Sequence, residues 1–504
     1  MIVSLSEDLL KIKRDIEGYA RGYGLDFFDT IFEMVDYQQI NALASYGGFP
    51  VRYPHWRFGM DYDQFSKGHE WGLQKIYEMV INTDPSYAYL LSSNSITDNK
   101  TVIAHVYGHV DFFKNNYWFS KTNRKMLDTM ANHAVKIRGY MDRYGQERVE
   151  TFIDHCLSLE NLIDPFLPFE EAEIEKRRRD QEHAQRWGAG DARPQENENK
   201  LKVDREYMSP YINPKDFVDS QRKRTVDEKE KAKKIPDSPQ KDVLRFLLQY
   251  APLEDWEREV LRIIRDEAYY FIPQMQTKIM NEGWASYWHS KIMTEKALKD
   301  SEIIDFADAH AGTLAMQPGR LNPYKVGIEL FRDIEDRWNR GKFGKAYDEC
   351  DDIVAKEQWD TKAGLGRQKI FEVRKVCNDL MFIDNYLTME FAIRHKLYTF
   401  EFNRRTNQYE IAEREFKKVK DKMLTMLTNM GNPFIYVTDG NFENRGELLL
   451  WHKHQGVDLD HKYARETLRA LQELWRRPIN IETTVESQRK LLSINKGEFS
   501  ERLL

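Results

Sequence analysis

Residues 102–116, VIAHVYGHVDFFKNN, combine an apolar helical pattern with two histidines four positions apart. At 100° per residue, the apolar side chains of this stretch cover one arc of a helix. That arc is formed by Val102, Ile103, Val106, Val110 and Phe113. His105 and His109 lie at its edge and close to each other. The pattern predicts a core helix in which both imidazole rings lean toward the protein interior.

This pair of histidines has two interpretations. Two histidines at positions i and i+4 can bind one cation, because their ring nitrogens can converge on a single point. Alternatively, they are ordinary buried histidines whose polar atoms are satisfied by backbone or carboxylate groups. The spacing alone leaves both interpretations open.

A second stretch, MQTKIMNEGWASYWHSKIM at residues 275–293, places an acidic group in an apolar helical face. That face comprises Met275, Ile279, Glu282, Ser286, His289 and Met293. Burying a lone carboxylate is costly, so Glu282 needs a partner. With His105 and His109 it would complete a His-His-Glu site, which leaves a coordination position open to water, as in catalytic zinc centres. His289 would then be a fourth ligand or a general acid/base; the alternative is a buried Glu282–His289 pair.

The segment HAGTLAMQPGRLNPYKVG, residues 310–327, adds two more candidates. His310 precedes a loop that contains glycine and proline, and Tyr324 follows Asn322-Pro323 where a new helix is expected to begin. A tyrosine at a helix start can donate its hydroxyl proton to developing negative charge in an adjacent cleft. The other interpretation of Tyr324 is a packing residue.

The composition indicates a globular protein. The chain has 504 residues, of which 41% are hydrophobic and 31% charged, and its formal net charge of -6 argues against general affinity for nucleic acid. Its three cysteines, Cys156, Cys350 and Cys377, are too far apart for a disulfide framework or a zinc ribbon. Neither a signal peptide nor a run of about 18 apolar residues is recognisable, so we expect no membrane span and a cytoplasmic location.

Changes in composition and periodicity predict four segments. Residues 1–170 are expected to form the first part of a helical core, with a short strand or extended segment at residues 86–95. Residues 171–241 are polar and charged, which predicts an exposed, partly disordered insertion; a basic docking tract is the alternative, but acids are interleaved throughout. Residues 242–390 continue the helical core. Residues 391–504 are expected to form a C-terminal α+β domain with β-α-β-β-α-β order and an antiparallel sheet.

Six motifs together resemble the SpoVR family, the stage V sporulation protein R group. They are YPHWRFG, YEMVINTDPSYAYL, AHVYGHVDFFKNN, PQMQTKIMNEGWASYWH, LNPYKVGIELFRDIEDRW and FIDNYLTMEFAIRHKLYTF. The resemblance covers nearly the whole chain outside the charged insertion. It implies a cytoplasmic bacterial protein linked to synthesis of the spore cortex peptidoglycan. It also implies two partners, a PrkA-type serine protein kinase and a von Willebrand-type-domain protein, but it supplies no reaction.

The order of the His-x-x-x-His helix, the NEGWA helix and the Y-x-x-G segment also resembles gluzincin metallopeptidases. This resemblance implies that His105, His109 and Glu282 hold zinc or another divalent metal. It further implies that the groups polarising a substrate are Tyr324, His310 or His289. We expect the three ligating atoms to lie within about 5 Å of one another, near twice the length of a zinc–ligand bond.

The chain departs from gluzincins at Val106, where those enzymes carry the glutamate that accepts a proton from zinc-bound water. Glu267 and Asp111 are the candidate replacements, although Asp111 projects away from the histidines. The overall expectation is a mainly α protein: a gluzincin-like helical core with a short sheet, plus a small C-terminal α+β domain. Its function is expected to be that of a metal-dependent hydrolase or transferase acting on a peptide, amide or cell-wall precursor. The alternative is a regulatory or scaffolding protein whose metal site is structural or absent.

Overall fold

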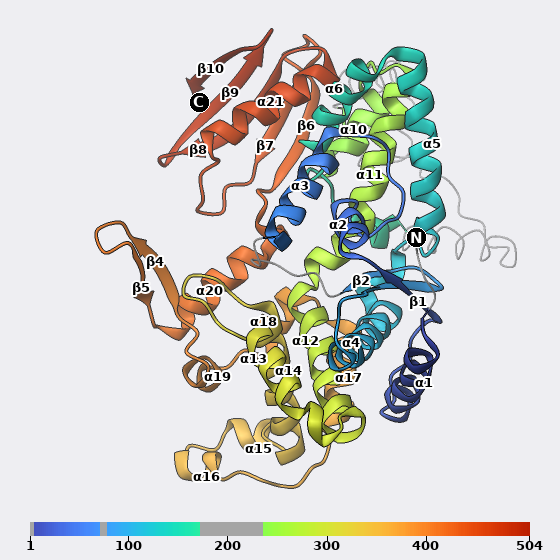
Figure 1. Cartoon of the computed structure of the whole chain (residues 1–504). Coiled ribbons are helices and arrows are strands. Elements are labelled where there is room, and N and C mark those ends of the chain that lie inside the picture. The colour runs from blue at the N-terminus through green and yellow to red at the C-terminus, as the bar shows by residue number, and fades with distance from the viewer. Residues whose placement is uncertain (1–4, 71–77, 172–234) are drawn as a thin grey trace, which may run out of the picture. The chain divides into compact units, whose positions relative to one another are not determined.

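The computed structural model describes residues 5–70, 78–171 and 235–504 (Figure 1). Contacts divide the chain into two compact units, one formed by residues 1–151 and 266–432 and the other by residues 152–265 and 433–504. These divisions differ from the four predicted segments. Most of the predicted insertion at 171–241 lies outside the described residues.

The first unit is mainly helical. Its helices are α1 (Glu7–Gly22), α2 (Tyr37–Ser45), α3 (Trp56–Glu70), α4 (Ile96–Asn115), α5 (Met126–Tyr144), α12 (Lys278–Ile292), α13 (Ile303–Thr313), α14 (Pro323–Arg340), α15 (Lys345–Asp348), α16 (Ile353–Glu357), α17 (Gly366–Val376), α18 (Asp379–Tyr386), α19 (Met389–Arg394) and α20 (Phe416–Leu427). Two more helices, α6 (Gln146–Leu157) and α11 (Asp255–Gln276), contain residues of both units. The prediction of a mainly α core is therefore confirmed.

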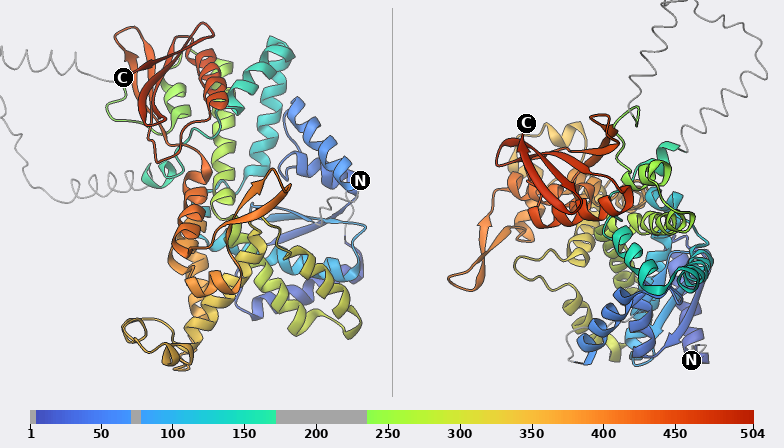
Figure 2. Two further views of the ribbon diagram at one scale, coloured as in Figure 1. Left: turned by 90° about the vertical axis from the view of Figure 1, so that its left-hand side faces the viewer. Right: turned by 90° about the horizontal axis from the view of Figure 1, so that it is seen from above.

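Two small sheets accompany these helices. The strands β1 (Thr30–Val35), β3 (Ser86–Leu91) and β2 (Glu78–Ile81) lie in that order, with β1 parallel and β2 antiparallel to β3. The strand or extended segment expected at residues 86–95 is confirmed for residues 86–91, which form β3, whereas β1 and β2 were not predicted. The strands β4 (Thr399–Asn403) and β5 (Gln408–Glu413) form a separate hairpin that projects from the helices (Figure 2).

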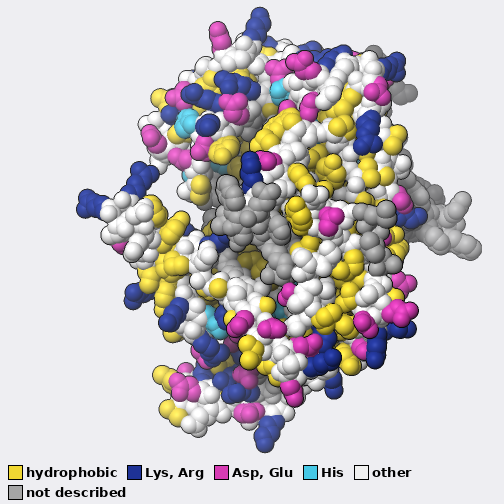
Figure 3. Space-filling model, viewed as in Figure 1, with side chains coloured by type: hydrophobic (Ala, Val, Ile, Leu, Met, Phe, Trp, Pro, Cys, Tyr) yellow, Lys and Arg dark blue, Asp and Glu magenta, His cyan; other side chains and the backbone are white. Residues whose placement is uncertain are grey.

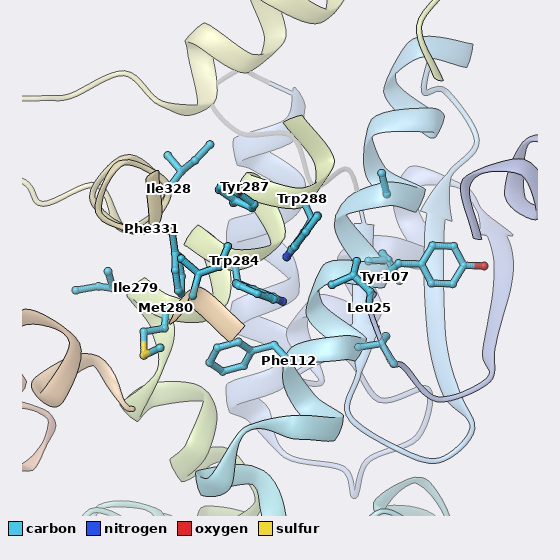
Figure 4. Packing of buried hydrophobic residues seen from close by; sticks show 14 of the residues in the cluster. Leu25, Tyr107, Phe112, Ile279, Met280, Trp284, Tyr287, Trp288, Ile328 and Phe331 are labelled. Carbon is cyan, nitrogen blue, oxygen red and sulfur yellow. The ribbon is translucent and has the colours of Figure 1, made fainter. Parts of the chain in front are cut away.

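Helices α4, α12 and α14 pack together around large aromatic side chains. Trp284 and Trp288 of α12 are fully buried, and the ring centroid of Trp284 lies 5.5 Å from that of Trp288 and 5.2 Å from that of Phe331 (Figure 4). The predicted apolar face of α12 begins only at Ile279. Met275 belongs to α11 and is exposed, because the backbone leaves helical geometry at Thr277 before α12 starts.

Glycines set how closely these three helices approach. A Cβ added to Gly283 of α12 would lie 2.4 Å from the Cα of Gly327 in α14. A Cβ added to Gly108 of α4 would lie 2.7 Å from the Cα of Ala285 in α12. No side chain fits at either position, so the helices meet backbone to backbone. Because Gly283 follows Glu282 and Gly108 precedes His109, these contacts fix the spacing of the candidate metal ligands.

The second unit contains a five-stranded sheet with the order β10-β9-β8-β7-β6. Its elements are α10 (Val243–Tyr250), β6 (Ile435–Phe442), β7 (Glu447–His452), α21 (His461–Trp475), β8 (Ile479–Val485), β9 (Gln488–Asn495) and β10 (Glu498–Leu503). The predicted α+β character of the C-terminal region is confirmed. The prediction of a wholly antiparallel sheet is wrong for β7 and β8, which pair in parallel because α21 connects them as a crossover helix. The predicted first hairpin, β4–β5, and helix α20 belong to the first unit.

Along the described ranges, no helix is both long enough and apolar enough to cross a bilayer. On the face shown in Figure 3, basic and acidic side chains are interspersed.

Candidate metal centre

The structure brings the three predicted metal ligands together. His105 and His109 project from α4 and Glu282 from α12, and all three side chains are buried. Glu282 Oε2 lies 3.5 Å from His105 Nε2 and 3.4 Å from His109 Nε2. The two imidazole rings stand perpendicular, with their centroids 4.5 Å apart.

These distances match the spacing of ligand atoms around a small divalent cation. Zinc bonds of 2.0–2.2 Å in tetrahedral geometry place neighbouring ligand atoms about 3.3–3.6 Å apart. Glu282 Oε2 makes no hydrogen bond of regular geometry to any of the described residues, although it is buried. The other carboxylate oxygen, Oε1, accepts a hydrogen bond from Lys278 Nζ at 2.6 Å. The donor set therefore fits a cation bound by one oxygen of Glu282 and one nitrogen of each histidine.

Neighbouring groups prepare His109 and Glu282 for this role. His109 Nδ1 lies 2.9 Å from Asn281 Oδ1 and donates its proton to that oxygen, which turns Nε2 toward Glu282. Burial opposes ionisation of Glu282, but His105, His109 and Lys278 hold the pKa of this carboxyl well below its usual range. Glu282 is therefore a carboxylate, the form that binds metal.

A second carboxylate, Glu78, lies beside the same histidines and was missed in the sequence. It comes from β2, and its Oε1 is 3.8 Å from His105 Nε2. Ligand-type atoms of Glu78, His105 and His109 all lie within 4.8 Å of one another. Burial raises the pKa of Glu78. In the sequence, Glu78 is visible only as a glutamate near the start of YEMVINTDP. Its position beside the histidine helix depends on the pairing of β2 with β3, which the sequence does not show.

A pocket of about 310 Å³ opens beside these groups. It is lined by Glu78, Thr97, Asp98, Thr101, Val102, His105, His289, Phe306, Ala309, His310, Thr313 and Tyr324. The ring of Tyr324 stacks on that of His105 with centroids 6.2 Å apart, and burial raises the pKa of Tyr324, so its phenol stays protonated. The structure thus gathers all three predicted polarising groups, Tyr324, His289 and His310, in one pocket.

His289 and His310 continue from His105 as a chain of imidazoles. His289 Nδ1 lies 2.8 Å from His105 Nδ1, and His289 Nε2 lies 3.1 Å from His310 Nδ1. Burial lowers the pKa of both His289 and His310, so both rings are neutral near pH 7. His289 therefore fixes the orientation of the His105 ring. Its hydrogen-bond partners are histidines and not Glu282, which was its partner in the alternative interpretation.

The two residues considered as replacements for the missing glutamate lie elsewhere. Glu267 binds Arg52 at 2.5 Å and His133 Nδ1 at 3.1 Å, and it does not line the pocket. Asp111 accepts hydrogen bonds from Trp284 Nε1 and from the backbone N–H of Asp26, both at 2.8 Å. Each carboxylate is already held by hydrogen bonds or an ion pair away from the candidate metal centre.

Asp379 holds the start of the helix that carries Glu282. Its two oxygens accept hydrogen bonds from the backbone N–H groups of Ile279 and Met280, each at 2.8 Å, which replaces the side-chain cap that Thr277 does not provide. Burial raises the pKa of Asp379 to about 7, against the effect of these two donors and of Lys278.

This raised pKa predicts a pH-dependent effect of Asp379→Asn. A carboxyl whose folded pKa exceeds its unfolded value of about 3.9 adds stability that is complete below that value and is lost as pH rises toward 7. Asparagine cannot ionise, so the variant should gain about 1 kcal/mol or more relative to wild type between pH 5 and pH 8. Denaturant unfolding at both pH values measures this change. Asp384→Asn, at an exposed position on α18, is the control; equal behaviour of the two variants would contradict the assignment.

Comparison with known proteins agrees with the resemblance seen in the sequence. Residues 4–432 match the family described as SpoVR like protein, and residues 433–486 match the SpoVR-like C-terminal domain. The boundary between these matches coincides with the one between the two compact units at Asn432 and Pro433. The chain is also 28% identical over 497 residues to "Uncharacterized protein YcgB" of Escherichia coli strain K12, covering 93% of this chain and 90% of the relative.

No solved structure matches the chain, so the likeness to gluzincins stays a prediction. The two family matches follow one another along the chain and together account for nearly all of it. The protein belongs to the SpoVR family.

Proposed function

We propose that this protein is a metal-dependent hydrolase that acts on an amide-type bond, with His105, His109 and Glu282 as ligands of a zinc-like divalent cation. The observation that carries the proposal is the position of Glu282 Oε2, buried without a regular hydrogen bond and 3.4–3.5 Å from two histidine nitrogens. Three protein ligands beside an open pocket are typical of catalytic rather than structural zinc sites.

The cation would supply Lewis acidity toward a substrate carbonyl group. Within the pocket, Glu78 takes the part of the glutamate that is absent at Val106: its Oε1 accepts the proton of the attacking water and later returns it to the leaving amine. Val106 cannot do so, because its aliphatic side chain has no proton acceptor, and it is buried in the apolar core. The raised pKa of Glu78 brings this base closer to neutrality.

The remaining pocket residues orient the metal ligands and stabilise the charge that develops on the substrate. Tyr324 keeps its phenolic proton and donates it as a hydrogen bond to the oxyanion that forms during attack. His289 and His310 hold the ring of His105, and the hydrogen bond from His109 Nδ1 to Asn281 fixes the second histidine. These contacts leave the reacting side of the pocket to Glu78 and Tyr324.

Family membership supports a proposal about the cellular role. The SpoVR relationship favours a part in forming the spore cortex peptidoglycan, in company with a PrkA-type serine protein kinase and a von Willebrand-type-domain protein. The scaffolding alternative shares these partners but assigns the metal a structural role. The two versions differ in what loss of the metal does to the fold.

Glu282→Gln separates the two versions. Glutamine keeps the size of the side chain but removes the charge that balances the cation, so metal affinity should fall about 10–100-fold or more. If the protein is an enzyme, the variant should lose function in a complementation assay while it unfolds at nearly the wild-type temperature and still captures its partners.

A structural metal would give a different result. Metal-binding free energy is then folding free energy, so Glu282→Gln should lose thermal stability and partner capture together. Glu295→Gln, which changes a carboxylate just beyond the end of α12 that does not line the pocket, serves as the control. Full complementation by Glu282→Gln would contradict the enzymatic proposal.

A further inference from the structure

We propose that the pocket beside the candidate metal centre binds a primary ammonium group on a short aliphatic chain. This inference deepens the proposed function and rests on it, since the ammonium group would belong to the substrate. The subsite lies at the end of the pocket formed by the first turns of α4, with Asp98 and Thr101 as the binding groups and Val102 and Phe306 as the apolar wall.

The first support is the sign of the charges that line the pocket. Its lining contains two carboxylates, Glu78 and Asp98, and neither lysine nor arginine occurs among the twelve described lining residues. A carboxylate or phosphate group entering this end would find neither lysine nor arginine in the described lining, whereas an ammonium group would find Asp98.

Basic side chains on the surrounding helices are already paired. Lys100 of α4 lies 2.7 Å from Glu302. Lys325 and Arg332 of α14 both bind Glu329, at 3.0 and 3.2 Å. These pairs neutralise the nearby positive charge outside the pocket lining, so they do not reverse the preference set by Asp98.

The second support is the direction of the hydroxyl hydrogen bonds. Thr101 Oγ1 donates to the carbonyl oxygen of Thr97, and Thr313 Oγ1 donates to that of Ala309, both at 3.0 Å. Each hydroxyl therefore already donates its proton within its own helix, and toward a ligand it can act only as a hydrogen-bond acceptor. The threonine oxygens that line the pocket consequently select ligands that donate hydrogen bonds.

The geometry of Asp98 agrees with this selection. Its Oδ2 accepts from the backbone N–H of Ser95 in a capping box, which holds the carboxylate at the start of α4. Its Oδ1 makes none of the hydrogen bonds found within the described residues, and the side chain is only partly buried. One carboxylate oxygen thus anchors the helix, and the other is left for a cationic donor.

The apolar wall defines what carries the ammonium group. Val102 and Phe306 are both 5% exposed, and the ring of Phe306 stacks on His310 with centroids 5.4 Å apart. A pocket of about 310 Å³ has room for an aliphatic chain of several methylene groups along this wall. Lysine-like side chains have this combination of an apolar stem and a cationic end.

The test uses n-butylammonium, n-butyrate and 1-butanol as probes of equal length, with binding measured by ligand-detected NMR on the metal-free full-length protein. We expect n-butylammonium to bind at least about tenfold more tightly than n-butyrate, with 1-butanol between them. Asp98→Asn should weaken n-butylammonium about tenfold while it keeps an oxygen for the Ser95 cap. Asp308→Asn, an exposed change on α13 outside the pocket lining, should have no effect.

Tighter binding of n-butyrate, or equal behaviour of Asp98→Asn and Asp308→Asn, would overturn the proposal. Thr101→Val provides a second variant with an intact cap, and it should weaken n-butylammonium about threefold. Zinc uptake is measured separately on the same samples. Ammonium binding without zinc uptake would contradict the proposed function and support this subsite, whereas zinc uptake without ammonium selectivity would contradict the subsite alone.

Discussion

Replacing both His105 and His109 with alanine is expected to abolish stoichiometric binding of a divalent metal. The pair supplies two of the three ligands, and their nitrogens lie 3.4–3.5 Å from the remaining one, Glu282 Oε2. At about 3 kcal/mol for each zinc ligand, the double change should weaken zinc binding by roughly 10⁴-fold. Competition with a chromophoric chelator measures the affinity, and elemental analysis of the dialysed protein measures the stoichiometry.

The control for this experiment is His461→Ala, an exposed histidine at the start of α21 in the second unit. It should retain wild-type metal content. A double variant that still carries one equivalent of zinc with unchanged affinity would show that these two histidines are not ligands. In that case the buried imidazoles would be explained by their contacts with Asn281 and His289.

The sequence allowed the helical part of the centre to be predicted. The i, i+4 spacing placed His105 and His109 on one side of a buried helix, and an acidic residue within the apolar face of α12 identified Glu282 as a candidate partner. Both inferences depend only on helical periodicity, which is local. That the two helices meet at these residues depends on Gly108 and Gly283, whose role becomes visible only from the backbone atoms opposite them.

Helical periodicity could not predict side chains whose positions depend on strand pairing or on packing between segments distant in sequence. Glu78 reaches the histidines because β2 pairs with β3, and no sequence spacing reports that pairing. The same limitation explains why Glu267 was wrongly considered as the base. Its buried carboxylate belongs to a cluster with Arg52 and His133, and this cluster depends on long-range packing. It also explains the parallel pair β7–β8, since β-α-β order fits either direction until the path of α21 is known.

Gly283→Ala is expected to destabilise the first unit by about 3 kcal/mol or more. The new Cβ would lie 2.4 Å from backbone atoms of Gly327, far inside van der Waals contact, and backbone atoms cannot move aside by changing a rotamer. Helices α12 and α14 must therefore separate. The better helix propensity of alanine offsets this cost by only about 1 kcal/mol.

The same separation should impair the metal centre. Glu282 precedes Gly283, so a shift of α12 moves Oε2 relative to His105 and His109 on α4, and metal affinity should fall although no ligand is replaced. Gly139→Ala is the matched control, because Gly139 also lies within a helix, α5, but an added Cβ there meets nothing within 4 Å. That variant should be neutral or up to about 1 kcal/mol more stable. Denaturant unfolding measures the free energy of unfolding of both variants, and zinc titration measures their zinc affinity. If both quantities are the same for Gly283→Ala and Gly139→Ala, the close contact between α12 and α14 does not set the geometry of the centre.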